Sequence, residues 1–124
     1  MSKINIPLDQ VRELRYDINT MSDLEERFDG QPIPELLKEG RIGMTLIRSI
    51  IYLGLKCGGM KFQGRSVEEN ERKVGTLIQD HWMAEGKDLK DLMDKAVEAF
   101  KAAGLFGKEE KEGENPNEGT DEPQ

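Results

Sequence analysis

The spacing of hydrophobic residues changes near position 17, which divides the chain into an extended start and a helical remainder. Before that point hydrophobic and polar residues alternate, as in strands with one buried face. The alternating hydrophobic positions are Ile4, Ile6, Leu8, Leu14 and Tyr16. The pattern predicts a β-hairpin with a turn at Asp9-Gln10. That turn lacks the glycine preferred in two-residue hairpin loops, so a longer loop that starts at Pro7 is the alternative.

From Asp17 onward the hydrophobic residues recur at spacings of three and four, which predicts an amphipathic helix. Its stripe consists of Ile18, Met21, Leu24 and Phe28. Asp17 has the side chain of a helix N-cap, and Gly30 is placed to end the helix. Pro32 and Pro34 then interrupt regular structure, and we expect a short helical connector from Pro34 to Gly40.

The segment 41–57 is hydrophobic around most of a helical circumference. Its hydrophobic residues are Ile42, Met44, Leu46, Ile47, Ile50, Ile51, Leu53 and Leu55. A helix without a wide polar face must be covered on several sides. We therefore expect residues 42–57 to form the central, most buried element. Gly43 and Gly54 lie within it, and we expect them to permit close packing of a neighbouring element.

Two further helices are expected after a loop that contains three glycines. Ser66 and Glu69 have the spacing of a capping box, in which the hydroxyl and the carboxylate each bind a free amide of the other residue. The buried stripe of this helix is expected at Val67, Val74, Leu77, Ile78 and Trp82. A break at Gly86 and a cap at Asp88 introduce the last helix, which Gly104 closes. Its stripe consists of Leu89, Leu92, Met93, Ala96, Val97, Phe100 and Ala103.

The composition changes abruptly after Phe106. Residues 107–124 contain no apolar residue, and they hold seven carboxylates and two lysines. Such a segment cannot offset its ordering entropy by burying surface. We therefore expect an α+β, mostly helical domain over residues 1–106, with a hairpin and about four helices, and a disordered acidic tail over residues 107–124.

Charge also limits the function of the chain. Its 124 residues carry a net charge of −7, of which the segment 107–124 contributes −5. A protein that binds nucleic acid through phosphate contacts needs the opposite balance. We therefore expect no nucleic-acid partner.

A single cysteine, Cys57, cannot form a disulfide within the chain, and the N-terminus lacks the charged and apolar segments of a secretion signal. These features predict a protein of the reducing cytoplasm. The most apolar stretch, from Ile42 to Cys57, contains Arg48 and Lys56 and is shorter than the roughly 20 residues of a membrane span. We therefore expect no membrane partner.

Candidate catalytic residues are few. His81 stands beside Trp82 without a nearby nucleophile, and Cys57 is expected to be a buried core thiol. The two would also lack further zinc ligands at suitable spacing. The helical carboxylates are typical of solvated faces: Glu25, Glu26, Asp29, Asp88, Asp91 and Asp94. We therefore predict no catalytic, cofactor-binding or metal-binding residues, and no cofactor.

The segment from Leu14 to Phe28 resembles one protein family. It contains Leu-Arg-Tyr-Asp at the end of the expected hairpin and Glu-Glu-Arg-Phe at the end of the following helix. This pattern is similar to the tail assembly chaperones of long-tailed phages and of related gene transfer agents. The later elements also resemble that family, through to the last helix from Leu89 to Phe100, so that the resemblance spans residues 4–106.

The resemblance implies a small non-enzymatic protein that keeps the long tape measure protein soluble before tail tube subunits polymerise around it. It implies action in the cytoplasm of the bacterial host and absence from the mature virion. It also implies that a frameshifted longer product recruits the tail tube subunit. An apolar groove and an acidic extension suit such a role. The six methionines are candidates to line the groove, although methionine more often fills a core.

Other classes of protein remain open. A helical regulator that binds DNA needs a basic recognition helix, but the best candidate, Arg65 to Lys73, also carries three glutamates. A small enzyme or enzyme subunit would use His81 or Cys57 together with a partner. A further alternative is a small helical adaptor or regulatory protein of a prophage, without catalytic activity. An exposed groove would also lead the isolated chain to self-associate as a homo-oligomer.

Overall fold

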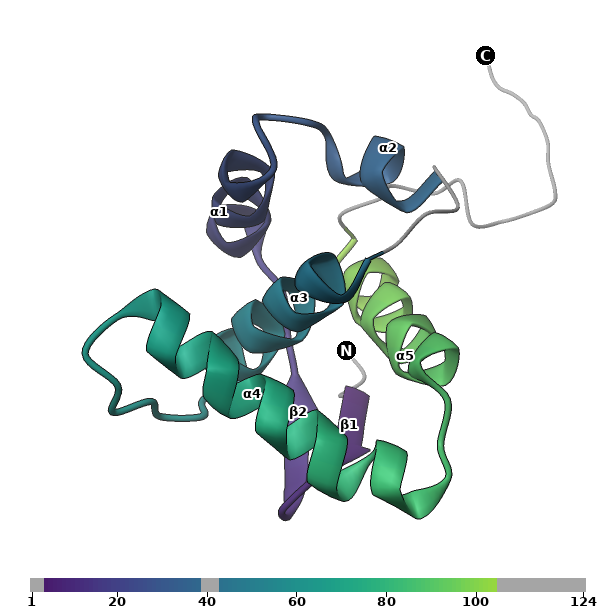
Figure 1. The fold of residues 1–124 in the computed structure, drawn as a ribbon. Helices are drawn as coiled ribbons and strands as arrows, with labels where there is room; N and C mark the ends of the chain where they lie inside the picture. Colours follow the sequence, from purple (N-terminus) through teal and green to yellow (C-terminus); the bar gives the residue numbers. More distant parts are fainter. Residues whose placement is uncertain (1–3, 39–42, 105–124) are drawn as a thin grey trace, which may run out of the picture.

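An antiparallel hairpin and five α-helices make up the fold in the computed structural model, which describes residues 4–38 and 43–104 (Figure 1). The elements are β1 (Ile4–Pro7), β2 (Val11–Leu14), α1 (Ile18–Arg27), α2 (Ile33–Lys38), α3 (Met44–Cys57), α4 (Val67–His81), the 3₁₀ turn η1 (Met83–Glu85) and α5 (Leu89–Ala102). This order confirms the predicted α+β, mostly helical fold. The acidic segment 107–124 lies outside the described residues.

Three residues form the hairpin loop, because β1 and β2 are paired up to Pro7 and Val11. The carboxylate of Asp9 organises this loop. It accepts hydrogen bonds from the amide of Gln10 at 2.9 Å and from Arg12 Nη2 at 2.8 Å. The guanidinium of Arg12 thereby lowers the pKa of Asp9. No residue of the loop has a positive φ, so the glycine of a two-residue turn is not needed.

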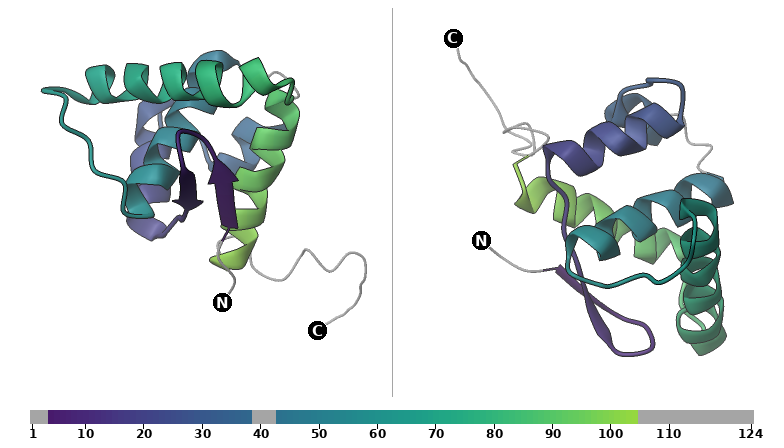
Figure 2. Two further views of the ribbon diagram at one scale, coloured as in Figure 1. Left: turned by 90° about the horizontal axis from the view of Figure 1, so that it is seen from below. Right: turned by 90° about the vertical axis from the view of Figure 1, so that its left-hand side faces the viewer.

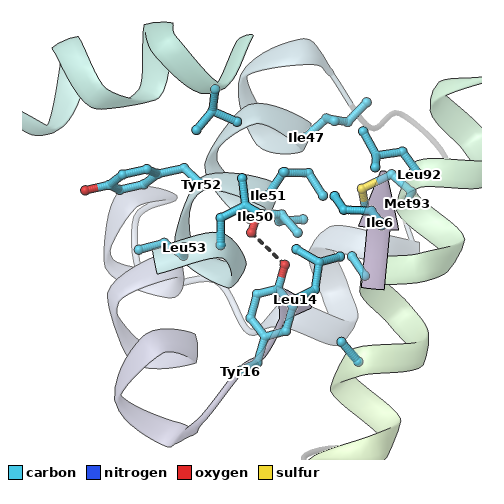
Figure 3. Packing of buried hydrophobic residues seen from close by; sticks show 14 of the residues in the cluster. Ile6, Leu14, Tyr16, Ile47, Ile50, Ile51, Tyr52, Leu53, Leu92 and Met93 are labelled. Atoms are coloured by element: carbon cyan, nitrogen blue, oxygen red, sulfur yellow. Dashed lines mark hydrogen bonds between the residues drawn. The ribbon is translucent and has the colours of Figure 1, made fainter. Parts of the chain in front are cut away.

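Helix α3 is the central element, as the sequence predicts. The hairpin, α1, α4 and α5 all contact it (Figures 1 and 2). Its buried residues are Leu46, Ile47, Ser49, Ile50, Ile51, Tyr52, Leu53, Gly54 and Leu55. In Figure 3, Ile6 of the hairpin and Leu92 of α5 meet the α3 side chains in one core. The first residue of the predicted helix, residue 42, lies outside the described residues.

The hairpin is fastened to α3 beside Gly54. The hydroxyl of Tyr16 donates a hydrogen bond of 2.7 Å to the carbonyl of Ile50, and burial raises the pKa of Tyr16 well above its ordinary value (Figure 3). A Cβ at Gly54 would overlap the Tyr16 hydroxyl. Close packing is thus confirmed for Gly54. For Gly43 the same prediction is wrong, because no atom of the described residues lies within 4 Å of a Cβ built there.

We expect Gly54→Ala to lower the free energy of unfolding by about 1–3 kcal/mol, because Tyr16 must move out of a packed site. Gly43→Ala is the matched control and should change stability by less than about 0.5 kcal/mol. Urea unfolding of the two variants measures the difference. Equal stability of both variants would show that Tyr16 has room to move.

Asp17 caps α1 as predicted. Its Oδ1 accepts hydrogen bonds from the amide and the hydroxyl of Thr20, each at 2.8 Å, and these bonds lower the pKa of Asp17. Two residues of the predicted stripes nevertheless face solvent: Ile18 is 74% exposed and Val67 is 46% exposed. Each is the first residue of its helix, directly after the N-cap, and the buried stripe begins one turn later.

Asp17→Asn tests the contribution of this charge. The pKa of the Asp17 carboxyl is lower in the folded state than its ordinary value of 3.8 in the unfolded chain. The carboxylate therefore stabilises the fold at pH values above 3.8, and this contribution disappears as the pH falls through the pKa of the folded state. We expect the variant to be less stable than the wild type at neutral pH by a few tenths of a kcal/mol, and equally stable in strong acid. Urea unfolding at several pH values measures this difference, with Asp80→Asn as a control. A difference that does not change with pH would contradict the expectation.

The caps of α4 and α5 differ in detail from the prediction. Ser66 Oγ accepts from the amide of Glu69 at 3.1 Å, but the Glu69 carboxylate accepts from the amide of Arg65, at 2.6 Å, and not from that of Ser66. Asp88 stands at the N-cap of α5 without a side-chain capping bond. Its carbonyl accepts from Trp82 Nε1 at 2.7 Å, so the junction is held by the backbone of Asp88.

Candidate partner-binding groove

An open apolar hollow of about 470 Å³ lies between α2, the start of α3 and the first half of α5. We call it the α2–α5 groove. Its apolar lining consists of Leu37, Met44, Ile47, Leu89, Met93 and Val97. Lys90 and Asp94 complete the lining, and they form an exposed ion pair with each other at 3.5 Å. Figure 1 shows how the start of α3 lies between α2 and α5.

The α2–α5 groove has an exposed methionine at its edge and buried residues at its base. Met44 is the first residue of α3 and is 68% exposed, so its thioether is available to a partner. Ile47 and Met93 are buried and form the inner wall. The charged groups that line the groove are already paired with each other. The surface therefore suits an apolar side chain, and flexible methionines allow it to adapt to different shapes.

The five methionines that the structure describes divide between the core and the surface. Met21 and Met93 are buried, and Met60 is half-buried against the core. Met44 and Met83 are exposed, but Met83 lies in η1 and does not line the groove. The predicted role of methionine as a groove residue therefore applies to Met44 and Met93.

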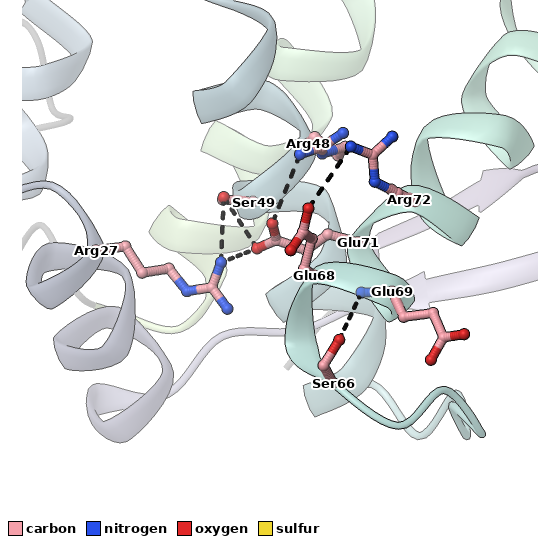
Figure 4. A network of polar contacts seen from close by, with 8 residues as sticks. All are labelled: Arg27, Arg48, Ser49, Ser66, Glu68, Glu69, Glu71 and Arg72. Atoms are coloured by element: carbon pink, nitrogen blue, oxygen red, sulfur yellow. Dashed lines mark hydrogen bonds and ion pairs between the residues drawn. The ribbon is translucent and has the colours of Figure 1, made fainter.

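A buried polar network joins α1, α3 and α4 (Figure 4). Glu71 is only 6% exposed, and its carboxylate forms an ion pair with Arg27. Ser49 donates a hydrogen bond of 3.1 Å to Glu71 and accepts one of 3.3 Å from Arg27. Arg48 lies 4.0 Å from the other carboxylate oxygen. The carboxylate is thus compensated on both sides, which suits a structural tie between helices.

This network was not predicted, because Glu71 stands in the sequence as one of several glutamates of a mixed-charge helix. A signal was present. Glu71 stands four residues after Val67 and three before Val74, which places it within the hydrophobic stripe of α4. A carboxylate on such a face indicates a buried partner of opposite charge.

The two candidate catalytic residues do not form a site. His81 is half-buried as the last residue of α4, and Cys57 is half-buried as the last residue of α3. No hydrogen bond joins them. The Cys57 thiol instead donates to Asp17 Oδ2 at 3.7 Å. The expectation of a core thiol is therefore wrong, because the last turn of α3 reaches the surface.

Most of the candidate carboxylates lie on the surface. Those exposed to solvent, as expected, are Glu26, Asp29, Asp88, Asp91 and Asp94. Glu25 is the exception: it is half-buried, and its Oε2 accepts a hydrogen bond of 3.0 Å from the amide of Ile33. Glu25 therefore holds the start of α2 against α1.

Within residues 4–38 and 43–104, no group of three or more His, Cys, Asp or Glu side chains is arranged to hold a metal ion. In the same part of the chain, no helix has both the length and the apolar character needed to cross a bilayer. No protein-family model, curated protein or solved structure matches the chain. The α2–α5 groove is an open hollow with a mainly apolar lining in the described part of the chain.

Proposed function

We propose that this protein is a tail assembly chaperone of a long-tailed phage or a related gene transfer agent, and that its α2–α5 groove binds an apolar helical stripe of the tape measure protein. The observation that carries the proposal is Met44, which is 68% exposed at an apolar groove of about 470 Å³. An amphipathic helix that places its apolar face into a groove is a common mode of peptide recognition.

The arrangement of the N-terminal elements supports the proposal. The Leu-Arg-Tyr-Asp stretch that carries the family resemblance begins with the last residue of β2 and ends with the N-cap Asp17. Tyr16 of this stretch fastens the hairpin to α3. The Glu-Glu-Arg-Phe stretch supplies Glu25, which binds the start of α2, and Arg27, which binds Glu71. Tyr16 and Glu25 therefore contact two of the helices that line the groove, α3 and α2.

In this function the protein covers apolar stripes of the tape measure protein in the host cytoplasm and is left out of the mature virion. The net charge of −7 keeps the complex from aggregating. A frameshifted longer form, which shares the folded domain, brings the tail tube subunit to the complex.

Met44→Glu tests the role of the groove. A carboxylate at an apolar contact must be desolvated when the partner binds, so we expect at least a tenfold loss of binding, equivalent to about 1.4 kcal/mol. Each variant is co-expressed with the tape measure protein, which is encoded beside this gene. The measurement is the amount of tape measure protein that stays soluble. Met83→Glu is the matched control, because it changes an exposed methionine outside the groove. We expect Met83→Glu to behave as the wild type.

Two results would overturn the proposal. One is a wild-type chain that does not raise the solubility of the tape measure protein. The other is equal activity of Met44→Glu and Met83→Glu. A wild-type chain that binds an apolar helical peptide through Met44, but leaves the tape measure protein insoluble, would support the small helical adaptor instead. Light scattering adds a further readout, because self-association through the groove should be weaker in Met44→Glu than in Met83→Glu.

A further inference from the structure

The loop between α3 and α4, together with the last turn of α3, is a basic part of an acidic chain. Residues 56–65, which we call the basic loop, contain Lys56, Lys61 and Arg65 and no carboxylate. All three side chains are exposed, and within the described part of the chain none of them forms an ion pair. The basic loop is therefore a positively charged segment of a protein of net charge −7.

A hollow of about 460 Å³ opens beside the basic loop. Its lining residues are Tyr52, Lys56, Gly59, Met60, Lys61, Phe62 and Asn70. Tyr52 is 2% exposed and forms one wall. Its ring packs edge-on against the ring of Phe62, with 5.0 Å between the ring centres. Lys56 Nζ lies 5.9 Å from the centre of the Tyr52 ring. We call this hollow the Tyr52 pocket.

The Tyr52 pocket brings several hydrogen-bond donors together. The Tyr52 hydroxyl points away from the core in Figure 3, and no hydrogen bond to it is formed within the described residues. The ammonium groups of Lys56 and Lys61 share the pocket, and no carboxylate lines it. On the other side of Tyr52, a second hollow holds Asp23 and Glu26 together with Arg27 and Lys56, so its charges are balanced. An anionic group therefore suits the Tyr52 pocket and not its neighbour.

We propose that the Tyr52 pocket binds carboxylates, and that its occupant is the acidic segment 107–124 of the same chain. Charge complementarity is the first argument, since this segment has a net charge of −5 and the basic loop one of +3. Its first carboxylates along the sequence are Glu109 and Glu110, and each carboxylate is a suitable acceptor for a lysine ammonium group or a tyrosine hydroxyl.

The position of the end of α5 is the second argument. The ring of Phe100, in the last turn of α5, meets the ring of Tyr16 with 4.6 Å between their centres. The Tyr16 hydroxyl donates a hydrogen bond to the carbonyl of Ile50, and the amide of Arg15 donates one to the carbonyl of Gly54. The end of α5 thus lies beside the second half of α3, which leads into the basic loop.

The length of the chain after α5 sets how far its carboxylates can reach. Along α3, Ile50 and Lys56 are separated by about 9 Å at about 1.5 Å per residue, and the Tyr52 side chain points to the side of α3 away from α5 (Figure 3). From Ala102 to Glu109 the chain extends for up to about 23 Å at about 3.3 Å per residue. A tether of this length gives an effective concentration in the millimolar range, so weak ion pairs are sufficient for docking.

Nuclear magnetic resonance of the full chain tests this proposal. Docking should shift the amide resonances of Glu109, Glu110, Glu112 and Glu114 at low ionic strength, and about 1 M salt should abolish the shift. In the double variant Lys56→Gln, Lys61→Gln at low salt, we expect these amide resonances to have the chemical shifts that the wild type shows only at high salt. The control variant Lys73→Gln, Lys95→Gln removes the same charge elsewhere and should keep the wild-type shifts. Unchanged core resonances show that each variant is folded.

Equal resonances of the acidic segment in the wild type and in the double variant at low salt would overturn the proposal. Shifts that grow with protein concentration would place the segment of a second copy in the pocket, and would overturn docking within one chain. Neither result bears on the α2–α5 groove, because the two sites share no lining residue. The proposal therefore stands or falls independently of the proposed function.

Discussion

Ile50→Asp is expected to unfold the domain. Ile50 is fully buried on the central helix, and its carbonyl accepts the hydrogen bond from Tyr16. The hairpin and the helices α1, α4 and α5 surround α3, so a carboxylate at this position has no access to water without the loss of packing. Burial of an unpaired charge costs several kcal/mol, against a total stability of about 5–15 kcal/mol for a domain. Circular dichroism and urea unfolding measure the loss.

Ile18→Asp is the matched control, because Ile18 is 74% exposed at the start of α1. It introduces the same side chain at a surface position, where substitutions usually change stability by less than about 0.5 kcal/mol. A folded Ile50→Asp variant that is as stable as Ile18→Asp would show that α3 is not the centre of the core.

Glu71→Ala is expected to lower the free energy of unfolding by about 3–5 kcal/mol, because removal of one partner leaves the other charge uncompensated in a partly buried site. The carboxylate of Glu71 compensates Arg27 and accepts the hydrogen bond from Ser49. Its loss removes the polar contacts of α4 with α1 and α3. Urea unfolding gives the magnitude.

Glu68→Ala is the control for Glu71→Ala, three residues earlier on the same helix. Its ion pair with Arg72, at 3.6 Å, joins two side chains that are about 70% exposed. Pairs of this kind contribute about 0–1 kcal/mol. If both variants lose the same small amount, the buried network does not stabilise the fold.

The order of elements could be predicted because its signals are local. The hydrophobic period changes near Asp17, and Asp17 and Ser66 cap helices that begin at the next residue. Whether the first residue of a helix is buried could not be predicted in the same way, because hydrophobic periodicity does not show where along its length a helix first contacts its neighbours. Ile18 and Val67 are exposed for this reason.

The candidate sites depend on contacts between distant segments, which a single sequence does not specify. Arg27 meets Glu71 only because α1 and α4 both pack on α3. The α2–α5 groove likewise combines Leu37 with Met93. The methionine content indicated an adaptable surface, but the sequence did not distinguish Met44, which lines the groove, from Met83, which does not.

The contact of α5 with β1 has a consequence for the synthesis of the protein. The hairpin is translated first, yet Ile6 is buried in a core to which α5, the last helix, contributes. Contacts between such distant segments form only after the intervening chain has been made. A nascent chain on the ribosome therefore keeps an incomplete core until α5 emerges. Any translation product that includes residues through Ala102 contains every element of this core, whatever sequence follows.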